Sequence, residues 1–264
     1  MNKLIKNLII AVSILLFVTE VKAQDAPNIT DSLGMKQGHW IKYENQKKIY
    51  DGNFVNSIPE GKFIYFSETG TPKAITIFSQ NGKVAYTQHL NSVGKIIGEG
   101  KYVNQQKDSL WKFYNDEGKL LSIEIYLNGV KNGSCKVYYT NGQLSEDKTW
   151  VNGFTDGSYT TYFENGEIKS KGQSIQDKLE GKTTFYYPSG KLGVEGYYKN
   201  DFKDGSWKYY NEDGTIKKTV LYKNGKTSNI AEQGIISKEE EARERKQYEN
   251  SDTINPYKNS AEPK

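Results

Sequence analysis

Aromatic, glycine and turn-forming residues recur along this chain with a period of 24 residues. In GSWKYYNEDGTIKKTVLYKNG, residues 205–225, two segments rich in tyrosine alternate with polar segments that contain glycine. The same order of residue types divides the chain into eight units, which span residues 38–60, 61–84, 85–108, 109–132, 133–156, 157–180, 181–204 and 205–228. Self-similarity at a fixed period indicates a repeat architecture, in which each unit packs mainly on its neighbours.

Five columns of similar residues, besides the glycine that begins most units, support this register. Most units begin with glycine, carry an aromatic residue two positions later and have a second aromatic residue three positions after that. A glycine nine positions from the start, a branched aliphatic residue and a late aromatic residue complete the unit. Cys135 occupies the first aromatic column of its unit, so we expect a packed thiol there rather than a nucleophile.

Each unit predicts two strands and two turns. In the last unit the strands are expected at 206–210 and 216–222, with Gly214 supplying the positive φ that ends the first hairpin loop. The turn after the second strand contains Asn-Gly, a strong hairpin signal. Turns this short join only antiparallel neighbours. The expected fold is therefore all-β, an elongated antiparallel β-meander of about eight 24-residue hairpin repeats, about 75 Å long at the usual strand spacing.

The third unit departs from the pattern. It has Thr87 and Leu90 where the other units carry mainly aromatic residues. Because cross-strand side-chain pairs stabilise a sheet, we expect the stack to bend or loosen across residues 85–108.

Units such as SLWKFYNDEGKLLSIEIYLNGVKN, residues 109–132, resemble MORN-type repeats. The resemblance is to the bacterial variant grouped with antitoxins of toxin–antitoxin systems, and it covers residues 38 to about 228. The Gly-x-Trp openings at Gly38–Trp40 and Gly205–Trp207 carry it, together with the tyrosine column and the hairpin glycine. It implies a β-meander that serves as an interaction scaffold with protein or lipid-headgroup contacts, without catalysis. The antitoxin grouping implies a neutralising protein.

Both ends of the chain lie outside the repeats. Lys3 and Lys6 precede an apolar run at residues 8–18, and Val21 and Ala23 fit the positions before a cleavage, so residues 1–23 predict a secretory signal peptide. The protein is therefore expected in the periplasm, at the cell surface or in the medium of a bacterium. A cytoplasmic antitoxin should not carry such a segment.

Residues 24–37 are a polar leader, and residues 229–264 break the period. Ser237 and Glu240 form a capping box that predicts a short, highly charged helix over residues 237–248. This helix is expected either to be marginal in water or to cover the edge of the last strand. The residues after it have the composition of a disordered tail.

Charge and residue chemistry exclude several functions. A net charge of +4 predicts no nucleic-acid-binding surface, and a single cysteine excludes an intramolecular disulfide. His39 and His89 are too isolated to suggest a metal site, and neither forms part of a nucleophile–histidine motif. The glycines fall at hairpin turns rather than in a phosphate-binding loop. We therefore expect no enzyme activity, no cofactor, no metal, and no membrane span once the signal peptide is removed.

Two functional classes remain open. The first is an exported scaffold that binds a protein partner, and the second is an exported module that binds glycans or the cell envelope through rows of aromatic rings. Middle strand positions vary from unit to unit, which favours one specific protein partner over a repeated sugar. The candidate binding residues are Trp111, Phe113, Trp207, Tyr209 and Trp40, because exposed aromatic residues contribute strongly to interfaces. The pattern leaves the oligomeric state open.

Export gives the first testable prediction. Intact mass or N-terminal sequencing of the native protein should show a chain that starts at Gln24, because cleavage is expected after Ala23. A full-length chain that stays in the cytosol would contradict the prediction.

Overall fold

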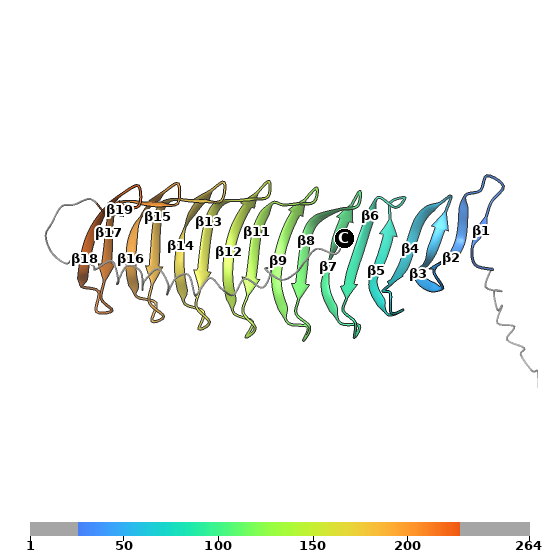
Figure 1. Ribbon diagram of the computed structural model, residues 1–264, viewed down its shortest axis with the longest axis horizontal. Helices are drawn as coiled ribbons and strands as arrows, with labels where there is room; N and C mark the ends of the chain where they lie inside the picture. The colour runs from blue at the N-terminus through green and yellow to red at the C-terminus, as the bar shows by residue number, and fades with distance from the viewer. Residues whose placement is uncertain (1–25, 228–264) are drawn as a thin grey trace, which may run out of the picture.

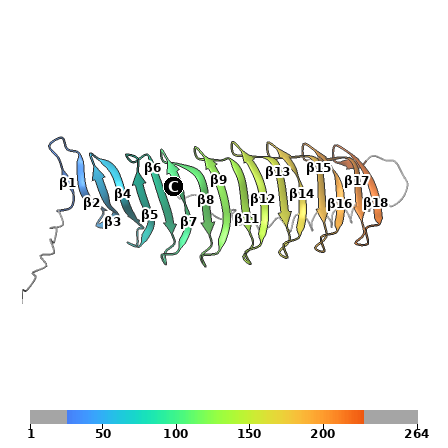
Figure 2. The ribbon, with the colours of Figure 1, turned by 180° about the vertical axis from the view of Figure 1, so that it is seen from behind.

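The computed structural model describes residues 26–227, and its 19 strands form one antiparallel sheet that is a single layer thick (Figure 1). Each strand pairs with the next along the chain, except that β10 and β11 share the place beside β9. The view from behind shows the same succession (Figure 2). The strands are β1 Ile29–Thr30, β2 Lys36–Glu44, β3 Lys47–Val55, β4 Ile58–Phe66, β5 Pro72–Ser79, β6 Val84–Leu90, β7 Ile96–Val103, β8 Gln106–Tyr114, β9 Leu120–Leu127, β10 Val130–Lys131, β11 Gly133–Tyr138, β12 Leu144–Val151, β13 Phe154–Tyr162, β14 Ile168–Ile175, β15 Lys178–Tyr186, β16 Leu192–Lys199, β17 Phe202–Tyr210, β18 Ile216–Lys223 and β19 Lys226–Thr227.

The structure confirms the all-β antiparallel meander. The sheet begins earlier than the repeats do, because β1 and the start of β2 come from the residues expected to form a polar leader. The strands at the start of each unit are also longer than expected. β17 starts at Phe202 rather than at Ser206, because Gly205, with a φ of 72°, is a bulge inside the strand and not part of the turn. The charged helix expected at 237–248 lies outside the described residues.

The turns explain the recurring asparagine and glycine residues. At one edge of the sheet, two-residue turns such as Asn128–Gly129 have positive φ at both positions, 50° and 85°, as a type I′ hairpin requires. At the other edge, Gly214 has a φ of 87° and donates its N–H to the carbonyl of Asn211. Both turn predictions are confirmed, and together they fix the 24-residue period.

The junction before the third unit differs from the others. Gly61 and Gly205 are bulge residues at the starts of their units. The third unit instead starts with Ala85, which lies within β6 and pairs with Phe78 of β5. These two strands pair from end to end without a register shift. Thr87 lies in the column where five other units carry an aromatic ring, and it shares a buried hydrogen bond of 3.0 Å with Thr76. The missing ring is thus replaced by a polar cross-strand pair.

One face of the sheet gathers most of the aromatic columns. Successive side chains in a strand point to opposite faces, so Phe63, Trp111, Tyr159 and Trp207 all lie on the same face, which we call the aromatic face. Trp111 and Trp207 are 0% and 1% exposed. A one-layer sheet therefore buries its largest side chains on this face.

The indole rings achieve this by lying across the neighbouring strand. Trp111 covers Gly100 so closely that a Cβ on this glycine would lie 2.3 Å from the ring. The indole Nε1 then donates to the carbonyl of Lys101 at 3.0 Å. Trp207 repeats the arrangement over Gly196, with a corresponding Cβ distance of 2.2 Å. These glycines do not have positive φ, so what they provide is space for a ring.

The ring-over-glycine contact predicts the effect of adding one methyl group. Gly196→Ala should lower the free energy of unfolding by about 1–3 kcal/mol, because the Trp207 ring must shift. Gly98→Ala is the matched control, since its Cβ would lie 3.2 Å from Phe113 and needs only a small adjustment. Chemical denaturation of the two variants checks this, and equal losses would contradict it.

Candidate functional site

The sequence-predicted binding residues all lie on the aromatic face, in separate groups. Trp111 and Phe113 stack with ring centroids 6.0 Å apart on β8. Trp207 and Tyr209 lie together in a buried cluster on β17, and Trp40 lies half-buried near the start of the sheet on β2. The two residues of each neighbouring pair, Trp111 with Phe113 and Trp207 with Tyr209, point to the same face of their strand. The expectation that Trp111 and Trp207 are exposed anchors is wrong, because their rings are buried against neighbouring glycines.

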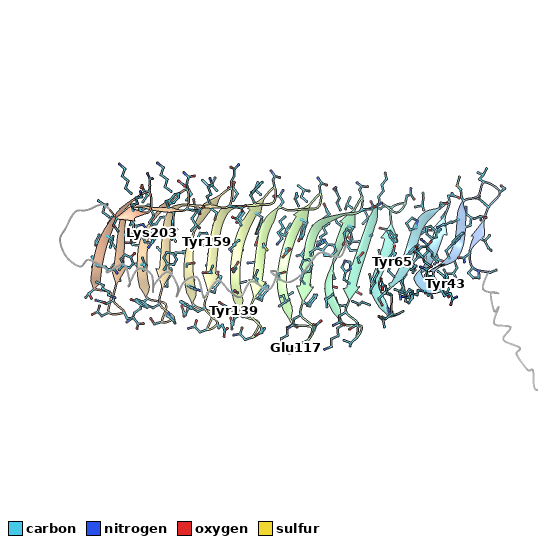
Figure 3. All side chains as sticks on the ribbon, viewed as in Figure 1. Tyr43, Tyr65, Glu117, Tyr139, Tyr159 and Lys203 are labelled. Atoms are coloured by element: carbon cyan, nitrogen blue, oxygen red, sulfur yellow. The ribbon has the colours of Figure 1, made fainter. Side chains whose placement is uncertain are left out.

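Lysines lie above these rings. The ammonium of Lys107 is 5.0 Å from the centroid of the Trp111 ring, and that of Lys203 is 4.5 Å from the Trp207 ring. Figure 3 labels Lys203 together with two tyrosines of the same face, Tyr65 and Tyr159. Such cation–π contacts stabilise each ring and place positive charge on the surface above it.

The middle of the aromatic face is polar. Glu124 is only 2% exposed, and it accepts hydrogen bonds from Tyr126 and Ser122 at 2.5 and 3.3 Å. Lys131 lies 3.1 Å from the same carboxylate. Burial raises the pKa of the neighbouring Cys135 thiol to about 11, so at neutral pH it is a protonated, packed side chain, as expected from its column.

The opposite face has a different character between β5 and β8. A hollow of about 580 Å³ lies there, lined by residues that include Ile77, Tyr86 and Leu110. These three side chains are 54%, 58% and 47% exposed. Large apolar side chains that gather on a solvated sheet face are the usual mark of an interaction surface.

Polar groups in and beside this hollow are held in place. Glu99 accepts hydrogen bonds from Tyr114 at 2.7 Å and from Gln88 at 3.1 Å, and these bonds lower the pKa of the Glu99 carboxyl. Lys101 forms an ion pair with Asp108 at 3.0 Å. The apolar centre thus has a rim that carries both signs of charge.

Sequence reasoning missed this hollow because it concentrated on the aromatic columns. The relevant signal is in the column directly after each unit start. This column is polar in all but two units, and the exceptions are Tyr86 and Leu110. The residues of the column are His39, Lys62, Tyr86, Leu110, Ser134, Ser158, Lys182 and Ser206.

Along one edge, hydrogen bonds join the longer loops of neighbouring units. Figure 3 shows Tyr139 and Glu117 at the edge where the longer loops lie. The Tyr139 hydroxyl donates to the carbonyl of Tyr162 at 2.6 Å, and Tyr187 bonds Tyr210 in the same way at 2.7 Å. These bonds span 23 residues, so they fix the spacing of adjacent units.

The model of the family described as "MORN repeat variant" matches five segments of the chain, residues 107–128, 131–152, 155–175, 179–200 and 203–224. Residues 107–224 carry MORN-type repeats. Successive matches start 24 residues apart, which agrees with the period of the turns. The MORN match covers the later strands, whereas the hollow on the opposite face lies mostly before it.

No curated protein matches the chain in sequence. Among solved structures, the chain is similar in part to "Crystal Structure of TarM", with 14% identity, a TM-score of 0.28 and coverage of 44% of this chain and 20% of that one. A second is the GtfA/B complex bound to UDP and GlcNAc, with 12% identity, a TM-score of 0.20 and coverage of 44% and 22%. The chain thus spans about a fifth of each of these proteins.

Within residues 26–227 there is no helix of the length and apolarity needed to span a membrane. Across the same residues, no group of three or more His, Cys, Asp or Glu side chains is arranged to hold a metal ion.

His89 makes the stability of the aromatic face pH-dependent. Its ring stacks on Trp111 at 5.9 Å, and burial, with Lys107 nearby, lowers its pKa below the usual value. The unfolded chain therefore binds a proton at His89 more readily than the folded chain does. The stabilisation that comes from neutral His89 should be fully present above about pH 6.5, and it should be lost as the pH falls through the pKa of His89 in the folded protein. His89→Gln should remove this part of the decrease. Denaturation between about pH 7 and 5 checks it, and parallel curves for both proteins would contradict it.

Proposed function

We propose that this protein is an exported, non-catalytic interaction scaffold that binds a protein partner at the hollow on its opposite face. The observation that carries the proposal is the exposure of Ile77, Tyr86 and Leu110 on β5, β6 and β8 of one sheet. MORN-type repeats support the scaffold architecture, and the sequence of residues 1–23 supports export.

The hollow has the composition of a protein interface. Interfaces join an apolar centre to a polar rim, and aromatic residues at the centre often contribute most of the binding free energy. Tyr86 supplies such a residue, with Ile77 and Leu110 beside it. The fixed carboxylate of Glu99 and the ion pair of Lys101 give the rim a defined charge pattern, which favours one partner over others.

A protein fits this surface better than a glycan. Sugar binding through stacking would use a row of exposed rings, whereas Tyr86 is accompanied by the aliphatic side chains Ile75, Ile77 and Leu110. Aliphatic side chains gain from contact with another apolar surface and offer a sugar hydroxyl no hydrogen bond. Glycan binding stays as the alternative, and the antitoxin role implied by the resemblance stays a prediction.

The test is a comparison of two tyrosines on the same face. Mature protein carrying Tyr86→Ser should lose capture of its partner from the cell-envelope fraction, since the ring is 58% exposed in the hollow. Tyr197→Ser is the matched control, because this ring is 51% exposed on the same face of β16 and lies outside the hollow. It should retain capture.

Equal loss of capture in both variants would contradict the proposed surface. Binding to an array of bacterial glycans that disappears with Tyr86→Ser, without any captured protein, would instead support the glycan alternative. Both variants should keep the unfolding transition of the wild type, because neither ring is buried.

A further inference from the structure

We propose that one edge of the opposite face, from β9 to β17, binds a basic amphipathic helix of a partner protein. A row of apolar side chains, which we call the apolar stripe, contacts the helix there. The stripe lies apart from the hollow between β5 and β8, so the proposal stands independently of the proposed function. Its members are Leu127, Val130, Val151, Phe154, Ile175 and Phe202.

The two-residue turns position the apolar stripe. Val151 and Phe154 pair across the turn Asn152–Gly153, and the other members flank equivalent turns of their own units. Trp150, next to Val151, points to the aromatic face, so Val151 and Phe154 point to the opposite face. These turns lie along the edge of the sheet away from Glu117 in Figure 3. The stripe therefore follows one margin of the opposite face.

All six side chains of the stripe are open to solvent. Their exposed fractions run from 42% at Val151 to 56% at Phe202. Lys178 and Lys199 occupy the two other positions beside these turns. With β10 and β11 in one place, the stripe extends over eight strand positions, about 34 Å at the usual spacing. A continuous exposed apolar row of this length indicates an interaction surface.

Carboxylates are fixed beside the stripe. Asp177 accepts a hydrogen bond from the backbone N–H of Thr155, and Asp201 accepts one from that of Leu179, both at 2.6 Å. Glu180 accepts one from a backbone N–H at 2.8 Å. Because these donors are uncharged, the bonds hold each carboxylate in position and leave its negative charge in place.

The charge of this edge favours a basic partner. The acids along β13 to β17 are Asp156, Asp177, Glu180, Asp201 and Asp204, and within residues 26–227 none of the five forms an ion pair. Against them stand Lys178 and Lys199, whereas Lys203 lies over the Trp207 ring on the aromatic face. Such an edge attracts lysine and arginine side chains and repels an anionic lipid surface.

The spacing of the stripe fits a helix that runs along the edge. Equivalent positions of neighbouring units are two strands apart, about 9.6 Å. Seven residues of a helix rise about 10.5 Å, so apolar side chains at i and i+7 can reach successive units. A partner strand along the edge would instead present side chains on one face about every 6.8 Å. A helix of about 22 residues spans the whole stripe.

Binding of a synthetic helix to the mature protein tests the proposal. The probe is a peptide of about 22 residues with leucines at i, i+3, i+4 and i+7 and lysines beside them, and a second peptide carries glutamate in place of lysine. By fluorescence anisotropy, the lysine peptide should bind at least about tenfold more tightly. The whole chain has a net charge of +4, so a general attraction would favour the glutamate peptide. Equal binding, or none, would overturn the proposal.

Matched variants locate the site. Phe154→Ser combined with Phe202→Ser should weaken binding of the lysine peptide at least about tenfold, because both rings are exposed anchors of the stripe. Val55→Ser combined with Ile58→Ser is the control, since this pair flanks an equivalent turn outside the stripe and is 47% and 40% exposed. The control should keep binding, as should Tyr86→Ser in the hollow. Equal losses in the two double variants would contradict the assignment.

Charge variants give a second readout. Asp177→Asn combined with Asp201→Asn keeps the acceptor oxygens for the backbone N–H groups and removes two charges. This variant should bind the lysine peptide severalfold more weakly at low salt, and the difference should disappear at about 1 M salt. Wild-type affinity at low salt would overturn the proposal.

Two further measurements test other occupants of the stripe. Vesicles of phosphatidylglycerol should not bind through it, and the oligomeric state of the mature chain should be the same with and without Phe154→Ser and Phe202→Ser. Vesicle binding that these changes abolish would identify a lipid surface as the occupant. Self-association that they abolish would identify a second copy, and either result would overturn the proposal.

Discussion

The packing of a large ring over a glycine of the next strand is the contact on which the whole sheet depends. A one-layer sheet has no second layer to cover its apolar side chains, so each ring must find contact within its own face. Trp111 over Gly100 and Trp207 over Gly196 solve this by lying flat across a neighbouring strand. A side chain at Gly100 or Gly196 would displace the ring above it, so these two positions require glycine.

This contact gives the two faces different roles. On the aromatic face, the rings are fixed by glycines below and lysines above, so they hold neighbouring units together. The opposite face is then free to vary from unit to unit without loss of the fold. The side chains of Tyr86 and Leu110 use that freedom, because they are apolar at positions where six other units carry polar residues.

The architecture could be predicted from the sequence because it depends on local signals. Asn128–Gly129 and Gly214 specify the hairpin turns through positive φ, and short turns leave only antiparallel pairing. The bulge at Gly205 could not be distinguished from a turn in the sequence, since positive φ fits both. The burial of Trp111 could not be predicted, because it depends on the pairing register of β7 and β8, which places Gly100 opposite the ring. The same register information is needed to see that Ile77 and Leu110 meet in one hollow.

The division of roles between the two faces is tested most directly by oxidative footprinting of the intact mature chain. Tyr86 and Tyr197 should be modified rapidly, since their rings are 58% and 51% exposed. Trp111 and Trp207 should stay unmodified until the protein unfolds, although indole is a readily oxidised side chain. Modification of Trp111 at the rate of Tyr86 in the folded protein would show that the aromatic face is open to water, and would contradict the account.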